Sequence, residues 1–180
     1  MPMPSQIKTA ILGLALIFGN LFAQAPTTRE ERRQAKVHEE YLKATLTIHV
    51  PTLTADSLKS ELNDTNLILV DVRQPNEQDV SMLPGALTPY AFSQKFRGGF
   101  PKDKHVVVYC TIGQRSGEYA QQLKAKNVPV QNLEGGILAW THAGGTLFRD
   151  SSGVKVKTKK VHVFDASMQK WIAVDYEAVW

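Results

Sequence analysis

The sequence has a single cysteine, Cys110, among 180 residues. One thiol cannot form an intramolecular disulfide, nor can it supply the cysteine pairs of a zinc or iron–sulfur site. The five histidines are scattered, at His38, His49, His105, His142 and His162. None of them forms a pair at the spacing typical of metal ligands. We therefore expect a protein that binds no metal and needs no organic cofactor.

The sequence also lacks a glycine-rich phosphate loop and a Gly-x-Ser-x-Gly elbow. These absences argue against a P-loop nucleotide-binding protein and a serine hydrolase of that type. The formal net charge is only +4 and the basic residues are dispersed, which is too little for a nucleic-acid surface. With 43% hydrophobic and 21% charged residues, the chain is predicted to form one globular domain with extensions.

No apolar run is long enough for a typical membrane-spanning helix. The longest, residues 10–23, covers fourteen residues, whereas a bilayer requires about 20. Lys8 precedes it and Ala23-Gln24-Ala25 follows, which is typical of a secretory signal cleaved near Ala25. We expect an exported protein, periplasmic or secreted. Because Pro26 after the cut would hinder signal peptidase, cleavage elsewhere and an uncleaved membrane anchor remain alternatives.

The stretch that carries chemistry is the one around Cys110. Val106 to Tyr109 reads as a buried strand, and a short turn leads from the cysteine to a helix predicted over 118–126. A helix N-terminus presents free backbone N–H groups and a positive dipole end, which stabilise a thiolate by about 0.3–1 kcal/mol. Such a cysteine is predicted to react as thiolate, unlike a buried, apolar and inert one.

Two residues of the turn support this interpretation. Gly113 lets the loop curl. Arg115 adds a cation whose planar fork suits sulfonate, sulfate or phosphate oxygens.

A second apolar run, 67–72, reads as a central strand of a parallel sheet because it is apolar on both faces. Asp71 and Arg73 stand at its C-terminal end, the side of an open α/β sheet where sites form. We assign them to support and electrostatics of the cysteine loop. A salt bridge that ties the strand to the loop after it is an equally good interpretation.

The remaining elements repeat the strand–helix order. The pattern predicts a Thr54-capped helix over 55–62, a strand over 86–89, a helix over 92–100 and a strand over 130–133. Glu134-Gly135-Gly136 follows as a tight turn whose glycines allow close approach to the cysteine loop. Trp140 is assigned to the core. This order predicts an α/β fold with a doubly wound, mostly parallel sheet flanked by helices.

We divide the chain into four segments: a signal segment 1–25, a charged linker or helix 26–50, a catalytic domain 51–148 and a C-terminal extension 149–180. Residues 154–157 and 161–164 alternate in polarity, and a turn at 165–169 is expected to lead into a further strand at 170–174. The extension is therefore predicted to be β-rich, with a hairpin packed on the domain.

Three blocks, in order, resemble the single-domain rhodaneses, a sulfurtransferase family. They are Leu67-Ile-Leu-Val-Asp-Val-Arg73 with Leu83-Pro-Gly-Ala86, Cys110-Thr-Ile-Gly-Gln-Arg-Ser116, and Leu133-Glu-Gly-Gly-Ile-Leu-Ala-Trp140. Together they cover roughly residues 53–148. The resemblance implies a rhodanese-like fold, and a cysteine that carries a sulfane sulfur as a persulfide cradled by loop amides.

On this basis Cys110 is expected to take the outer sulfur of a small anionic donor such as thiosulfate and to pass it to a thiol, cyanide or a redox protein. Arg115 would hold the oxyanion of the donor, so its loss would raise KM more than it disturbs folding. The remaining predicted binding positions, which would supply backbone amides, are Thr111, Ile112, Gly113, Gln114 and Ser116.

Two alternatives remain. A cysteine phosphatase or arsenate reductase can be built on the same scaffold. Those enzymes, however, separate cysteine and arginine by five residues, where this sequence has four between Cys110 and Arg115, and usually place a histidine where Tyr109 stands. The shorter loop favours one sulfur atom over a tetrahedral phosphate. The second alternative is a non-catalytic binding module, against which the intact cysteine and arginine argue.

Overall fold

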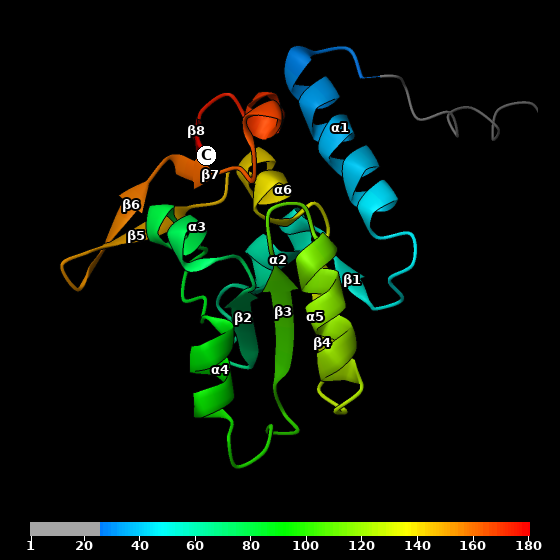
Figure 1. The fold of residues 1–180 in the computed structure, drawn as a ribbon, viewed down its shortest axis with the longest axis vertical. Coiled ribbons are helices and arrows are strands. Elements are labelled where there is room, and N and C mark those ends of the chain that lie inside the picture. The colour runs from blue at the N-terminus through cyan, green and yellow to red at the C-terminus, as the bar shows by residue number, and fades with distance from the viewer. Residues whose placement is uncertain (1–25) are drawn as a thin grey trace, which may run out of the picture.

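The chain forms a parallel sheet with helices on both faces and smaller elements at one end (Figure 1). The computed structural model describes residues 26–180. The predicted signal segment 1–25 therefore lies outside the described residues. Within 26–180, no helix combines the length and the apolar character that crossing a membrane requires.

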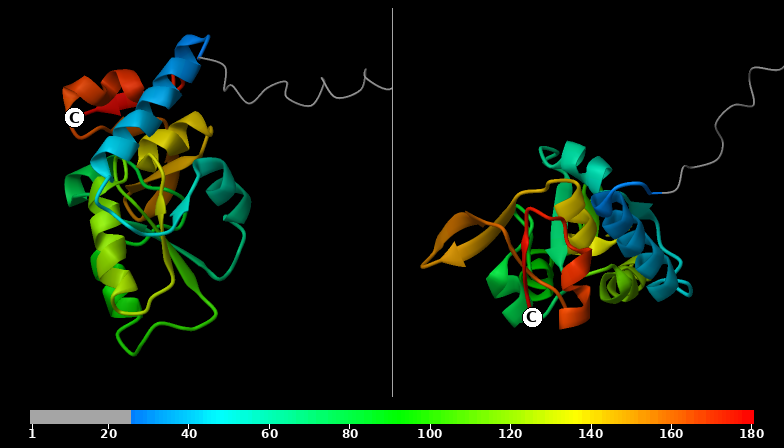
Figure 2. Two further views of the ribbon diagram at one scale, coloured as in Figure 1. Left: turned by 90° about the vertical axis from the view of Figure 1, so that its right-hand side faces the viewer. Right: turned by 90° about the horizontal axis from the view of Figure 1, so that it is seen from above.

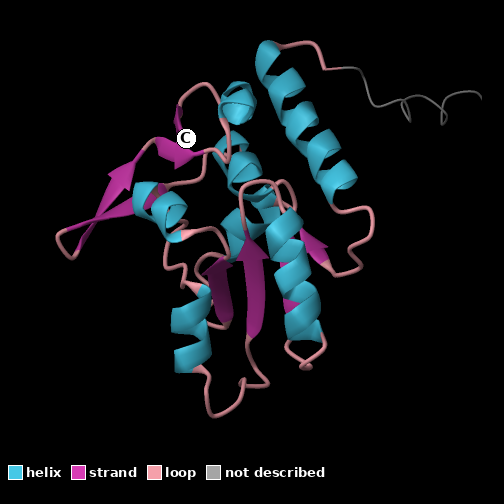
Figure 3. Cartoon of the chain, viewed as in Figure 1, coloured by secondary structure: helices cyan, strands magenta, loops and turns pink. Residues whose placement is uncertain are grey.

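The sheet consists of β1 (Thr52–Leu53), β2 (Leu67–Asp71), β3 (His105–Tyr109) and β4 (Val130–Leu133). Its order is β1-β4-β3-β2, and every neighbouring pair is parallel. All strands therefore end at the same edge, which Figure 3 shows for the arrow tips of β2 and β3. The predicted fold class, an α/β fold with a parallel sheet flanked by helices, is confirmed.

Helices cover both faces of the sheet (Figure 2, left). Alternate residues of β2 and β3 divide the apolar core accordingly, since successive strand side chains point to opposite faces. Leu69 and Val107 face a cluster that includes side chains of α2 (Ala55–Glu61) and α6 (Gly136–His142). On the opposite face, strand residues pack against α4 (Pro89–Lys95) and α5 (Gln114–Lys124). Both strands are thus buried on two sides, as their uninterrupted apolar runs predict.

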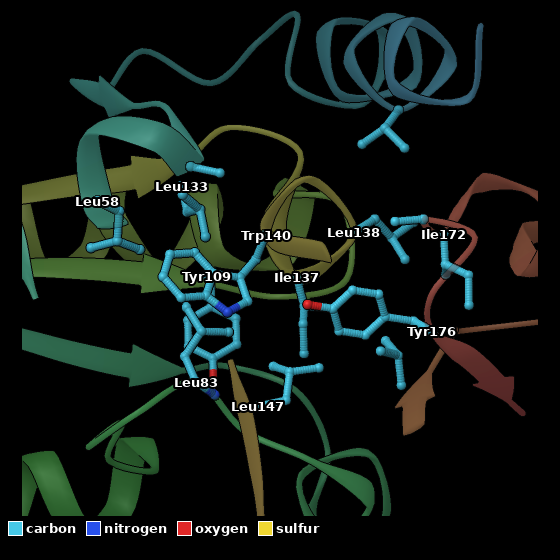
Figure 4. Close-up of a cluster of buried hydrophobic side chains, with 14 of the residues drawn as sticks. Leu58, Leu83, Tyr109, Leu133, Ile137, Leu138, Trp140, Leu147, Ile172 and Tyr176 are labelled. Carbon is cyan, nitrogen blue, oxygen red and sulfur yellow. Dashed lines mark hydrogen bonds between the residues drawn. The ribbon is translucent and has the colours of Figure 1, made fainter. Parts of the chain in front are cut away.

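The larger cluster joins the sheet to the C-terminal end of the chain (Figure 4). Trp140 lies at its centre with no exposed surface, and its indole Nε1 donates to the Thr146 carbonyl at 3.1 Å. The assignment of Trp140 to the core is confirmed. Tyr176, in the last turn of the chain, packs in the same cluster and donates its hydroxyl proton to the Gly145 carbonyl at 2.7 Å.

The connection from β2 to β3 differs from its prediction. The predicted strand 86–89 is reduced to one bridge between Leu87 and Val70, and the predicted helix 92–100 begins and ends earlier, as α4. The reason is the dipeptide Thr88-Pro89. Thr88 caps the helix through its side chain, which accepts from the Ala91 amide at 3.1 Å, and proline at the first helical position is preorganised for a helix start.

The N-terminal helix α1 (Arg29–Ala44) lies on the domain next to α6. Its exposed face is highly charged, but Val37 and Tyr41 are 1% and 4% exposed. His142 of α6 links α1 to the C-terminal extension: its Nδ1 lies 2.7 Å from a Glu30 carboxylate oxygen, and its Nε2 lies 2.7 Å from the Trp171 carbonyl oxygen.

The C-terminal extension contains two small sheets. A hairpin joins β5 (Leu147–Ser151) to β6 (Val154–Thr158), and β7 (Lys160–His162) pairs in parallel with β8 (Glu177–Val179). The strand predicted at 170–174 is wrong. Asp165 instead caps a 3-10 helix, η1 (Ala166–Trp171), by accepting from the Ser167 amide at 2.7 Å.

Candidate functional site

Cys110 directly follows β3, at the carboxyl edge of the sheet, and opens the loop into α5. The backbone N–H of Gly113 donates to the Cys110 Sγ at 3.1 Å. Gly113 itself is the N-cap of α5 and has φ +106°, a left-handed conformation that glycine adopts without strain. The chain therefore curls around the sulfur because a glycine stands three residues after the cysteine.

The turn before α6 supports this loop from behind. The Ile137 amide donates to the Cys110 carbonyl at 2.9 Å, and the Leu138 amide donates to the Thr111 carbonyl at 3.3 Å. Gly136 has φ +55°, and a Cβ there would lie 2.4 Å from the Cys110 carbonyl oxygen. The predicted close approach between the double-glycine turn and the cysteine loop is therefore confirmed.

Asn132 of β4 fastens the same loop to the neighbouring strand. Its Oδ1 accepts from Ser116 Oγ at 2.7 Å, and its Nδ2 donates to the Gly113 carbonyl at 2.8 Å. Tyr41 of α1 packs on the loop from outside, so close that a Cβ at Gly113 would lie 2.7 Å from its ring. The loop is thus fixed from both sides.

Arg115 is paired with a carboxylate that comes from α3 (Pro75–Val80). Its Nη1 and Nη2 contact the two Glu77 oxygens at 2.6 and 2.9 Å, and Nη2 also donates to Thr111 Oγ1 at 2.9 Å. Burial raises the pKa of Glu77, but the bonds from Arg115 and from the Gln74 amide outweigh it and hold that pKa at about 2. The hydrogen-bonded Glu77, together with the nearby Cys110 sulfur, raises the pKa of Arg115.

This pairing changes what Arg115 can offer a ligand. Three of the five guanidinium N–H donors are used in the bonds to Glu77 and Thr111. Two donors remain, so binding of an oxyanion by Arg115 stays a prediction that must use them. The charge beside the sulfur is that of an ion pair rather than of a bare cation.

Asp71 and Arg73 form a separate, fully buried ion pair. Arg73 Nη2 lies 2.7 Å from Asp71 Oδ2, and the same oxygen accepts the Tyr109 hydroxyl proton at 2.7 Å. Arg73 also donates to the Ser81 carbonyl oxygen in the loop after α3. This is the salt bridge that ties the strand end to its loop. An electrostatic effect of the pair on Cys110 stays a prediction.

The other predicted residues are placed differently from one another. Thr111 Oγ1 donates to Glu77 Oε1 at 3.2 Å, Ile112 is half-buried against the larger core cluster, and Gln114 is exposed. Within residues 26–180, Gly113 is the one backbone amide hydrogen-bonded to the sulfur. That the backbone amides of Thr111, Ile112, Gln114 and Ser116 also bind the sulfur or the donor therefore stays a prediction.

Cys110 is only 1% exposed. This fraction alone would fit the inert, buried thiol that the sequence argued against. Three contacts distinguish it: the Gly113 amide on the sulfur, the charged Arg115 beside it, and the α5 N-terminus below it. An apolar pocket would supply none of these.

Sequence reasoning missed two residues that shape the site. Glu77 had a usable signal, because Pro75 at the helix start and an acid two residues later are typical of a first helical turn. Its pairing with Arg115, 38 residues away, had no sequence signal. Asn132 lies in a short strand whose burial the sequence does not show, although a polar residue buried in a strand requires hydrogen-bond partners.

The sequence predicted that loss of Arg115 would raise KM more than it disturbs folding, but the bonds to Glu77 change this expectation. We expect the Arg115→Ala variant to lose stability as well as donor binding, because it leaves the buried Glu77 carboxylate without its cation. Breaking a pair of this kind costs about 3–5 kcal/mol, and the lower end applies since Arg115 is 28% exposed. Glu77→Gln should also destabilise. Its difference from wild type should be full above pH 4.5, where unfolded Glu77 is ionised, and should shrink as the pH falls toward 2.

Urea unfolding of wild type, both single variants and the double variant would measure the coupling. A double-mutant coupling near zero, or a Glu77→Gln difference that does not change with pH, would contradict this account.

Comparison with known proteins places these features in a family. Residues 54–143 match the model of the rhodanese-like domain family. A curated protein from Allochromatium vinosum named "Sulfurtransferase" is 38% identical over 98 residues, which is 53% of this chain and 92% of that protein. "Uncharacterized protein YqhL" from Bacillus subtilis is 32% identical over 111 residues, or 61% of this chain and 77% of that one.

Among solved structures, the thiosulfate sulfurtransferase of Pseudomonas aeruginosa superposes with a TM-score of 0.53 at 19% identity. The match covers 77% of this chain and 26% of that protein. At this identity the likeness concerns the fold alone.

Proposed function

The chain belongs to the family of proteins with a rhodanese-like domain, and from this premise we propose that it is a sulfurtransferase that carries sulfur on Cys110 as a persulfide. The relative named a sulfurtransferase supports this assignment, because 92% of its length aligns with this chain at 38% identity. The proposal extends to thiosulfate as the donor that should be tested first.

One observation carries the proposal: the Cys110 Sγ accepts a backbone N–H in a glycine-shaped loop at the N-terminus of an 11-residue helix. A backbone donor and a helix dipole both favour negative charge at that position. They stabilise a thiolate before the reaction and a persulfide anion after it. An inert structural cysteine stays a neutral thiol, so neither the amide donor nor the helix dipole would be needed to stabilise it.

The reaction has two steps. The Cys110 thiolate attacks the outer sulfur of thiosulfate; a new S–S bond forms, the bond to the sulfite group breaks, and sulfite leaves with the electron pair. A thiolate or cyanide then attacks the outer sulfur of the persulfide and regenerates the thiolate. The residues present can supply the Gly113 amide at the sulfur and the two remaining Arg115 donors for the anionic donor.

Intact mass measurement tests this directly. The protein incubated with thiosulfate should gain the mass of one sulfur atom, and added cyanide should remove it. Because Cys110 is the only cysteine, the added sulfur can have one position. Failure to gain the sulfur from thiosulfate or from an organic thiosulfonate would contradict the proposed function.

The phosphatase alternative makes a different prediction. The Arg115 fork, which would clamp a phosphate, is already bonded to Glu77, and this favours sulfur transfer. Hydrolysis of an aryl phosphate faster than sulfur transfer from thiosulfate would reverse the choice. A binding module without activity would show neither reaction.

We also propose that the protein is exported, with residues 1–25 as the signal, 26–50 as a linker or helix, 51–148 as the catalytic domain and 149–180 as an extension. In an oxidising compartment a lone cysteine is either inert, linked to another chain or catalytic. Mass measurement of the protein isolated from its host, together with cell fractionation, would test cleavage and location.

The acceptor of the sulfur is proposed to be a thiol, cyanide or a redox protein, and the described residues favour none of the three over the others.

A further inference from the structure

Phe164 projects from the C-terminal extension, outside the segment that matches the family model. It follows two core residues, Val161 and Val163, each with no exposed surface, and precedes Asp165, the cap of η1. The backbone on both sides of Phe164 is therefore fixed. The alternation that buries the two valines turns the Phe164 side chain outward, and it is 60% exposed.

The Phe164 ring lies on the guanidinium of Arg115, with 5.5 Å between the ring centroid and Cζ. The strand before it, β7, packs against α3, which carries Glu77, and Asn76 Nδ2 lies 3.4 Å from His162 Nε2. The extension thus holds an aromatic ring against the same arginine that Glu77 binds. A cation–π contact at an exposed site is weak, equivalent to about a two- to fivefold preference for the stacked position.

The approach to the sulfur passes this contact. Cys110 is 1% exposed, and Gly113, whose amide bonds to the sulfur, is buried. The Arg115 side chain, which bonds to Thr111 in the same loop, is 28% exposed. The guanidinium is thus the more exposed of these two groups of the loop, and we take the approach to Cys110 to run along it. Arg115 cannot move aside without leaving Glu77, but the ring of Phe164 can rotate about its side-chain bonds.

We propose that Phe164 is the specificity-determining residue of the Cys110 site: its ring narrows the approach along Arg115, admits slender anionic sulfur donors and excludes those with a bulky group beside the reacting sulfur. The choice of sulfur donors as the excluded molecules rests on the proposed function. The size limit itself can be tested with reagents that do not transfer sulfur. If the ring instead bound the apolar part of a substrate, the wild type would prefer bulky donors and Phe164→Ala would lose that preference. The two roles of the ring can therefore be distinguished by experiment.

Alkylation of Cys110 tests access without any sulfur chemistry. Wild type and Phe164→Ala are treated with N-methylmaleimide and with fluorescein maleimide, which share one electrophile and differ in size. The ratio of the bulky to the small reagent's rate cancels changes in thiolate reactivity. Phe164→Ala should raise this ratio about tenfold, the scale on which steric exclusion by a side chain acts. Phe164→Leu, which keeps most of the bulk, should stay near wild type.

Val174→Ala is the matched control, because Val174 is equally exposed, at 60%, and lies in the same extension. Its ratio should not change. An unchanged or lowered ratio in Phe164→Ala would overturn the proposal, as would a complete lack of reaction with either maleimide in all variants.

The same variants assayed with thiosulfate and benzenethiosulfonate separate this inference from the proposed function. Phe164→Ala should raise kcat/KM for benzenethiosulfonate relative to thiosulfate by a similar factor. If neither donor transfers sulfur but the alkylation ratio rises, the proposed function fails and the size limit stands. If both donors react and neither ratio changes, the size limit alone fails.

Discussion

The Cys110→Ser variant should lose sulfur transfer by more than about 10⁴-fold and should gain no sulfur from thiosulfate, because removing a covalent nucleophile removes the pathway rather than slowing it. A serine hydroxyl at this position can still accept the Gly113 N–H bond, so the loop should keep its shape. Thiosulfate:cyanide kinetics and intact mass would measure the loss. The substitution is small and conserves the hydrogen bond, which keeps the variant close to wild type in structure.

Thermal unfolding and circular dichroism provide the control for this variant. A melting temperature within a few degrees of wild type would show that the lost activity is chemical. Residual turnover above about one per cent in the serine variant would place the reacting group elsewhere and would remove Cys110 from the mechanism.

Much of the sheet could be predicted from local patterns. The runs Leu67–Asp71 and His105–Tyr109 are apolar on both faces, so their burial in a parallel sheet follows from their composition. Thr54 and its helix were equally local. The Thr88-Pro89 start of α4 was misread, although it is a local signal too, because a strand was expected to occupy residues up to Pro89.

The ion pair and the ring at the site could not be predicted, since both depend on long-range contacts. Glu77 meets Arg115 across 38 residues, and Phe164 reaches the same arginine from an extension with weak periodicity. The sequence gives residue types but no distances between such segments. The sequence therefore indicated an unpaired Arg115 guanidinium and an accessible Cys110 thiol. In the structure the guanidinium is bonded to Glu77, and Cys110 is buried.

These two differences have a common consequence. A sulfur open to solvent, beside a bare cation, would react with any anionic or oxidising compound of suitable charge. The structure instead places it in a fixed loop beside a paired arginine, and the ring of Phe164 lies on that arginine. On the two proposals made above, the cysteine loop supplies reactivity, and Phe164, which lies outside the matched family segment, limits what reaches it.

The Gly136→Ala variant should be destabilised by more than about 4 kcal/mol and should lose activity even where it folds, because the added methyl group has no room. Its Cβ would lie 2.4 Å from the Cys110 carbonyl oxygen and 2.6 Å from that of Thr111. Relief requires the α6 turn to retreat, which breaks the Ile137 bond to Cys110 and releases the loop that holds the sulfur. Urea unfolding and the rate of Cys110 alkylation would measure the two effects.

Gly85→Ala separates crowding from backbone strain. Gly85 also has a left-handed conformation, with φ +68° against +55° for Gly136, but an added Cβ there meets nothing within 4 Å. This control should cost only about 1–2 kcal/mol, the penalty of the left-handed conformation itself, and should leave activity unchanged. Equal losses in the two variants would mean that conformation alone, and not contact with the cysteine loop, requires glycine at Gly136. The shape of the loop around the sulfur would then have to depend on Gly113 and Asn132, which act on it from the other side.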